Sequence, residues 1–98
     1  MTLTIINQNV LNNYYQTNMN LLLLTGNACN KCEFIKPKLV ELCEAKWISL
    51  EVMDALEYKW EHLSEITSLP TMIISQELVN DTVLDYDGIM NWYLSNNN

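Results

Sequence analysis

Short apolar runs alternate with longer amphipathic stretches along the first half of the chain. Residues 3–6 predict a short strand, and residues 7–17 predict a helix because their apolar positions recur at helical spacing. The continuous apolar run Leu21–Leu24 is typical of a strand that is buried on both faces of a mainly parallel sheet. The chain therefore opens with a predicted β-α-β order.

The middle of the chain changes from helical to strand periodicity. Apolar residues recur every three or four positions from Cys29 to Lys46, which predicts a long helix, and Pro37 inside it is expected to kink it. Residues 48–53 alternate between apolar and polar side chains, which predicts a strand with one inward face.

The last third of the chain combines one helical pattern with two short strand patterns. Tyr58–Ile66 predicts a short helix, and Thr71–Ser75 and Thr82–Tyr86 predict two strands of a hairpin. Gly88 is expected to break the chain before a final helix over Ile89–Ser95.

The predicted order β-α-β-α-β-α-β-β-α indicates an α/β fold with a central mixed sheet that helices flank. Residues 1–98 are short enough to form a single domain, and we expect the tail from about residue 95 to fray. Apolar residues make up 49% of the chain and charged residues 17%, which is a globular composition.

Charge and targeting signals narrow the functional classes. A net charge of −7 argues against nucleic-acid binding, because too few cations are available to neutralise phosphates. The N-terminus lacks the basic region of a signal peptide, and Leu21–Leu24 is too short to span a membrane. We therefore expect a monomer in the reducing cytoplasm, or in a host cytoplasm if the asparagine-rich composition reflects a viral source.

Cys29 and Cys32 form a C-x-x-C motif where the long helix begins. Such a pair can be a metal clasp, a structural disulfide or a redox pair. Structural zinc takes four ligands, but Cys43 lies about 16 Å further along the same helix and His62 stands alone. We therefore predict no metal and no cofactor, and favour a redox pair.

These features together resemble the thioredoxin family. The C-x-x-C motif follows a buried strand, Pro37 lies where thioredoxins carry a helix-kinking proline, and S-L-P-T at 68–71 precedes an apolar strand as their cis-proline does. The similarity extends over about residues 21–94 and implies a thioredoxin-like fold. Two departures are the dipeptide Asn30-Lys31 between the cysteines, and Leu23 where thioredoxins have a buried aspartate.

The motif predicts a thiol–disulfide oxidoreductase in which Cys29 is the exposed nucleophile and Cys32 resolves the mixed disulfide. The positive end of the helix dipole should lower the pKa of the Cys29 thiol, and Asn30 and Lys31 are candidates for tuning it. The leucine at position 23 leaves Cys32 without an obvious base. We therefore expect slow resolution, a water relay or another carboxylate, with Asp54 and Glu57 as candidates.

The resemblance also implies a substrate groove. It assigns a cis bond to Pro70, backbone pairing with an extended substrate to Leu69, and neighbouring positions to Thr71, Tyr86 and Gly88. The expected partners are protein disulfides, together with a reductase or glutathione as electron donor. A glutathione-dependent glutaredoxin-like enzyme and a non-catalytic binding module of the same fold remain alternatives.

Two residues outside the motif have simpler interpretations. Cys43 falls on the apolar stripe of the long helix and is expected in the core, where a free cysteine behaves as a small hydrophobe. His62 lies in a polar stretch and is expected to be solvated.

Overall fold

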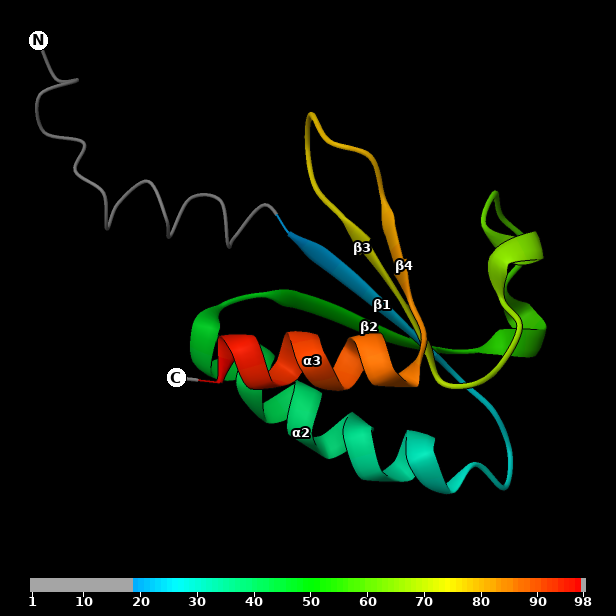
Figure 1. Cartoon of the computed structure of the whole chain (residues 1–98), viewed down its shortest axis with the longest axis horizontal. Coiled ribbons are helices and arrows are strands. Elements are labelled where there is room, and N and C mark those ends of the chain that lie inside the picture. The colour runs from blue at the N-terminus through cyan, green and yellow to red at the C-terminus, as the bar shows by residue number, and fades with distance from the viewer. Residues whose placement is uncertain (1–18, 98) are drawn as a thin grey trace, which may run out of the picture.

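The structure, a computed structural model, describes residues 19–97 (Figure 1). The strand predicted at residues 3–6 and the helix predicted at residues 7–17 lie outside the described residues. The described elements, in chain order, are β1 (Asn20–Thr25), α2 (Asn30–Lys46), β2 (Ser49–Asp54), the 3-10 turns Ala55–Glu57 and Leu63–Glu65, β3 (Thr71–Ser75), β4 (Thr82–Leu84) and α3 (Tyr86–Asn96).

The four described strands form one mixed sheet in the order β2-β1-β3-β4. β1 pairs in parallel with β2, whereas the β1–β3 and β3–β4 pairs are antiparallel. The prediction that β1 lies in a mainly parallel sheet is therefore wrong for the described strands. After β2 the chain stays at the end of the sheet where the C-termini of β1 and β2 lie. β3 therefore starts at that end and runs antiparallel to β1.

β1 is buried from both sides, as its unbroken apolar sequence predicted. Leu21 and Leu23 belong to the larger core, which forms between the sheet and the helices. Leu24 points to the opposite face, where it packs with Tyr58 and Ile73. Figure 1 shows α2 and α3 on the same side of the sheet. The buried members of the larger core are Leu21, Leu23, Ile35, Leu39, Cys43, Ile48, Met72, Ile74 and Ile89.

α2 confirms the predicted long helix. Its helical residues begin one position after Cys29, which is the N-cap, and continue through Pro37 to Lys46. The chain leaves the helix at Trp47, which has a left-handed backbone with φ of 60°. This turn directs the Trp47 side chain into solvent, where it is 81% exposed.

The helix predicted at Tyr58–Ile66 is wrong, because only two separate 3-10 turns form between β2 and β3. Asp54 is the N-cap of the first turn, and its carboxylate accepts the N–H of Leu56 at 2.8 Å. Tyr58 is buried, and its hydroxyl oxygen accepts the N–H of His62 at 3.2 Å. A side chain thus takes the bond that an α-helix would give to the backbone carbonyl of Tyr58.

α3 begins earlier than predicted, so two expectations are wrong. Strand β4 ends at Leu84, which places Tyr86 at the start of α3 rather than at the end of a strand. Gly88 does not break the chain, because its N–H donates to the capping carboxylate of Asp85 at 2.9 Å. The helix continues to Asn96, beyond the predicted end at Ser95.

Glycine suits position 88 because the helix starts very close to the preceding strand. A Cβ atom there would lie 3.0 Å from Cδ2 of Leu84.

Within residues 19–97 we find no helix whose length and apolar character would let it cross a membrane.

Candidate redox site

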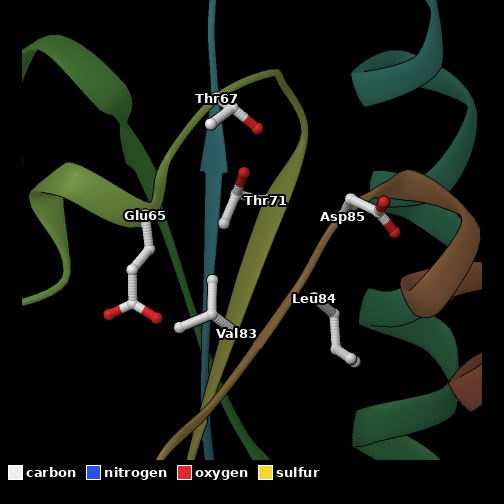
Figure 2. A pocket seen from close by; sticks show the side chains of 6 residues that line it. All are labelled: Glu65, Thr67, Thr71, Val83, Leu84 and Asp85. Carbon is white, nitrogen blue, oxygen red and sulfur yellow. The ribbon is translucent and has the colours of Figure 1, made fainter.

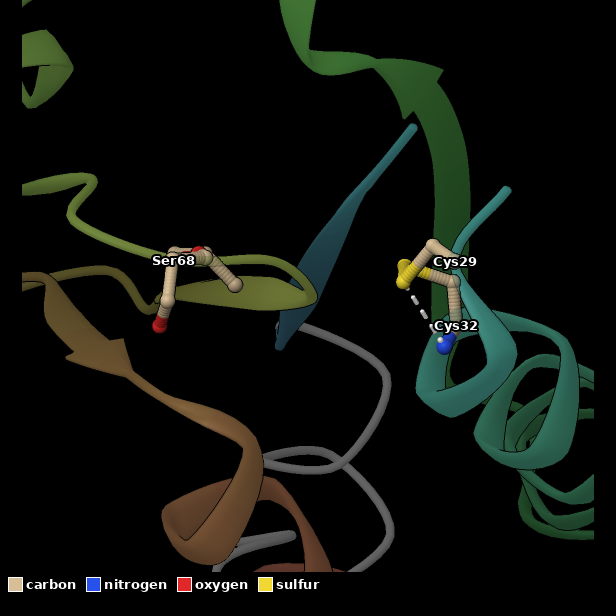
Figure 3. Close-up of a disulfide and its surroundings, with 4 residues drawn as sticks. Cys29, Cys32 and Ser68 are labelled. Atoms are coloured by element: carbon tan, nitrogen blue, oxygen red, sulfur yellow. Dashed lines mark hydrogen bonds between the residues drawn. A yellow bond between two sulfur atoms is a disulfide. The ribbon is translucent and has the colours of Figure 1, made fainter. Parts of the chain in front are cut away.

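Cys29 and Cys32 are joined by a disulfide, with 5.2 Å between their Cα atoms (Figure 3). Cys29 is the N-cap of α2, and its sulfur accepts the backbone N–H of Cys32 at 3.1 Å. Cys32 is buried, with 2% of its surface exposed, whereas Cys29 is partly exposed. An incoming disulfide can therefore reach the sulfur of Cys29 more easily than that of Cys32.

The loop after β1 turns the chain so that Cys29 meets the end of the helix. Ala28 has a left-handed backbone with φ of 53°, and the first helical bond runs from the N–H of Glu33 to the carbonyl of Cys29 at 3.1 Å. The first backbone N–H groups of a helix have no partners within the helix and carry partial positive charge. They would stabilise a Cys29 thiolate once the disulfide is reduced.

The S-L-P-T segment lies beside this loop. The Leu69–Pro70 peptide bond is cis, and Pro70 is fully buried. A Cβ atom on Gly26 would lie 2.7 Å from Cδ1 of Leu69, which shows how closely the two loops approach. Figure 3 shows the loop that carries Ser68 opposite the disulfide.

Thr71 is anchored at the start of β3, where its hydroxyl donates to the carbonyl of Ser68 at 2.7 Å. It also lines a hollow of about 300 Å³, together with Glu65, Thr67, Val83, Leu84 and Asp85 (Figure 2). Thr71 thus belongs both to the S-L-P-T segment opposite the disulfide and to the lining of this hollow.

Lys31 and Tyr86, predicted separately for pKa tuning and for the groove, lie together. The ammonium nitrogen of Lys31 is 5.0 Å from the centre of the Tyr86 ring, which is a cation–π distance. The contact connects the start of α2 to the start of α3. Asn30 is exposed in the first turn of α2. The N–H of Gly88 donates to Asp85, and a Cβ atom at position 88 would lie against Leu84, so Gly88 belongs to the junction between β4 and the cap of α3.

Solved structures of thioredoxins have the same architecture. Mitochondrial thioredoxin 3 from Saccharomyces cerevisiae, in its oxidised form, matches with a TM-score of 0.59 and 17% identity over 86% of this chain and 84% of that one. Thioredoxin f2 from Chlamydomonas reinhardtii matches with a TM-score of 0.60 and 13% identity over 92% of this chain and 88% of that one. The fold is thioredoxin-like.

A mutant thioredoxin from Halobacterium salinarum gives a similar match, with a TM-score of 0.58 and 17% identity over 94% of this chain and 87% of that one. No protein-family model matches the sequence, and no curated protein is significantly similar to it. At this level of identity the similarity establishes only the thioredoxin-like fold of a divergent chain.

The structure confirms a buried leucine at position 23, where thioredoxins have a buried aspartate. Leu23 is fully buried among the apolar residues of the larger core. Asp54 caps the turn after β2 through Leu56, and Glu57 is exposed. Neither observation places a carboxylate against Cys32.

Cys43 is buried in the core, which confirms its predicted structural role. Burial raises the pKa of its thiol to about 11, because the thiolate would lose its hydration. Cys43 therefore stays a thiol at neutral pH and is a poor nucleophile compared with an exposed cysteine.

His62 is not the solvated residue that the sequence predicted, because its side chain is only 18% exposed. Its Nδ1 lies 2.6 Å from Oε2 of Glu65, and its Nε2 lies 2.9 Å from Oδ2 of Asp81. Hydrogen bonds to these carboxylates raise the pKa of His62 above its ordinary value of 6.5. Glu65 was visible as a near neighbour in the sequence, but Asp81 is brought in by the hairpin.

Glu61, His62 and Asp81 also offer ligand atoms that lie within 4.8 Å of one another. His62 is therefore not alone, contrary to the sequence-based argument against a metal. Its ion pairs with Asp81 and, at 3.7 Å, with Glu61 account for the closeness of these groups.

The raised pKa of His62 predicts that the stability of the protein depends on pH. His62 gains its partners only on folding, so its contribution to stability is fully present below pH 6.5 and is lost as the pH rises through the raised pKa. Thermal unfolding of the wild type and of His62→Gln, from about pH 5 to about pH 8, should show the larger difference in melting temperature at the acid end. A difference in melting temperature that is constant with pH, or larger at the alkaline end, would contradict the stabilising ion pairs of His62 with Glu65 and Asp81.

Proposed function

We propose that this protein is a thiol–disulfide oxidoreductase that reduces or exchanges protein disulfides through Cys29 and Cys32. The observation that carries the proposal is the disulfide at the start of α2, in which the N-cap cysteine is partly exposed and its partner is buried. The S-L-P-T segment, which lies beside the loop that leads to Cys29 and opposite the disulfide, supports a groove for an extended substrate at this place.

The reaction starts from the reduced pair. The Cys29 thiolate attacks one sulfur of the substrate disulfide, which forms a mixed disulfide and releases the other substrate sulfur as a thiolate. Cys32 then loses its proton and attacks the sulfur of Cys29. This step releases the second substrate sulfur and forms the Cys29–Cys32 disulfide, so that two electrons pass to the substrate. An external dithiol or glutathione has to restore the reduced pair.

The attack of Cys32 on the mixed disulfide is the step that is affected by Leu23 replacing the buried aspartate of thioredoxins. Cys32 is buried, and burial of a thiol opposes the loss of its proton. Leu23, which stands where thioredoxins have a carboxylate, has no group that could accept this proton. We expect the resolution of the mixed disulfide by Cys32 to be slow, with water as the proton acceptor, because the Asp54 carboxylate bonds to the N–H of Leu56 instead. A slow second step prolongs the lifetime of the mixed disulfide.

Insulin reduction tests the proposed function. The protein is supplied with NADPH and either thioredoxin reductase or glutathione with glutathione reductase, and turnover is also measured with dithiothreitol alone. Turnover with thioredoxin reductase or with dithiothreitol supports the proposal, and turnover with glutathione alone assigns a glutaredoxin-like enzyme. No rate above background with any donor would assign a non-catalytic binding module.

The start of α2 predicts a Cys29 thiol pKa below the ordinary value of about 8.5. It can be measured from the pH dependence of iodoacetamide alkylation in the reduced protein. Lys31→Gln should raise this pKa, because it removes a cation from the first turn. Lys46→Gln is the matched control, since it removes the same charge about 26 Å from Cys29 along the helix axis. A Cys29 pKa at or above the ordinary value would contradict the assigned nucleophile.

A further inference from the structure

The cation–π contact between Lys31 and Tyr86 lies at the redox motif itself. Lys31 directly precedes Cys32 in the first turn of α2, and Tyr86 is the first residue of α3. The Lys31 ammonium nitrogen lies 5.0 Å from the centre of the Tyr86 ring, and aromatic rings attract cations within about 6 Å. A residue that is distant in sequence thus contacts the dipeptide between the two cysteines.

Tyr86 offers a ring that the core holds in place. It is half-buried and packs against the larger core beneath the helices. The helix that carries it begins at the Asp85 cap, and Ile89, one turn further on, is fully buried. The Lys31 side chain, in contrast, is exposed and has a flexible four-carbon stem. The ring therefore limits the region in which the ammonium lies.

This contact holds the ammonium near the side of α2 that borders the proposed substrate groove. Side chains of a helix lean toward its N-terminus, so the Lys31 stem leaves α2 toward the end that carries Cys29. Tyr86 follows Asp85, which lines a hollow together with Thr71 (Figure 2). Thr71 belongs to the S-L-P-T segment, which lies opposite the disulfide. The ammonium is therefore held where the first turn of α2 meets this groove.

Among the described residues in the first turns of α2 and α3, Lys31 is the only one that carries a positive charge. No Lys or Arg follows Lys59 in the sequence, so neither α3 nor the S-L-P-T segment supplies one. The other charges at the two helix starts are the carboxylates of Glu33, Asp85 and Asp87. Carboxylates disfavour a nearby thiolate, and an ammonium that is held in place opposes them.

We infer that Tyr86 is a positioning residue, which holds the Lys31 ammonium where it stabilises the thiolate of Cys29. The inference rests on the proposed function, because this thiolate is the nucleophile of the proposed reaction. Without the ring, the charge would be spread over the many orientations of an exposed side chain, where water and salt screen it. A stabilised thiolate also favours the reduced pair, so Tyr86 makes the disulfide more oxidising.

The pH dependence of iodoacetamide alkylation at Cys29 in the reduced protein tests the inference. Tyr86→Leu removes the ring and should raise the pKa of the Cys29 thiol by about 0.3 or more, which is about a 2-fold loss in its ionisation constant. Tyr86→Phe keeps the ring and should leave this pKa within about 0.1 of the wild type. In the Lys31→Gln background, Tyr86→Leu should cause no further rise, because the ring then has no cation to hold.

A second cation–π contact on α2 provides the matched control. The Lys38 ammonium lies 4.7 Å from the centre of the Phe34 ring, further from the start of the helix. Phe34→Leu should therefore leave the Cys29 pKa within about 0.1 of the wild type. The contact itself can be observed in the wild type by NMR. The methylene protons of Lys31 next to the ammonium should be shifted upfield by the Tyr86 ring, and this shift should disappear in Tyr86→Leu.

Several results would overturn the positioning role. They are a Cys29 pKa that is unchanged or lowered in Tyr86→Leu, an equal rise with and without Lys31, and Lys31 methylene signals at their ordinary positions in the wild type. Equal rises in Tyr86→Leu and in either Tyr86→Phe or Phe34→Leu would assign the effect to general packing and would also overturn it. Failure of the proposed function is distinct, because it appears as absent insulin turnover or as a wild-type Cys29 pKa at or above the ordinary value.

Discussion

Cys29→Ser is expected to reduce the rate of insulin reduction by a factor on the order of 10³ or more, to the background of the reductant. A serine hydroxyl at the start of α2 cannot form the mixed disulfide, so the reaction loses its first step rather than part of its rate. Turnover with dithiothreitol as the sole donor measures this effect without depending on a particular reductase.

The third cysteine provides the control. Cys43 is buried and its thiol pKa is raised to about 11, so Cys43→Ala should retain most of the wild-type rate per folded molecule. Loss of activity in Cys43→Ala with retained activity in Cys29→Ser would reverse the assignment of the nucleophile.

Leu39→Ala is expected to destabilise the protein by about 2–5 kcal/mol. Leu39 is fully buried on the face of α2 that meets the sheet, and the substitution leaves a cavity that its neighbours in the larger core fill only in part. Urea unfolding of the oxidised protein, monitored by circular dichroism, measures the free energy of unfolding.

Leu78→Ala is the matched control, because the same side chain is 98% exposed in the turn before β4. Its free energy of unfolding should stay within about 0.5 kcal/mol of the wild type. Similar losses for both variants would mean that the buried face of α2 does not stabilise the fold as described.

The local elements could be predicted where one pattern dominated. The strands at Leu21–Leu24 and Thr71–Ser75 and the helix from Cys29 to Lys46 are confirmed, because each has an unbroken apolar or helical period. The predicted helix at Tyr58–Ile66 is wrong, and there the N–H of His62 donates to the hydroxyl oxygen of Tyr58 instead of to its backbone carbonyl. The early start of α3 depends on the Asp85 cap, which competes with the strand propensity of the residues before it.

The candidate site was predictable to a similar extent. The C-x-x-C spacing correctly placed the two sulfurs within reach of one another, and the stripe on α2 correctly placed Cys43 in the core. The contact between Lys31 and Tyr86 and the ion pair between His62 and Asp81 were missed. Both join residues that are distant in sequence, so the first depends on how α3 packs beside α2, and the second depends on how the β3–β4 hairpin meets the connector between β2 and β3.

The roles of the two sulfurs can be separated in the Cys32→Ser variant. Without a resolving thiol, attack by Cys29 on a peptide disulfide should stop at a stable mixed disulfide, which intact-mass analysis detects as an adduct and peptide mapping assigns to Cys29. Wild-type protein under the same conditions should release the peptide and end as the internal disulfide. Failure to form any adduct, or an adduct on Cys43, would contradict the proposed chemistry.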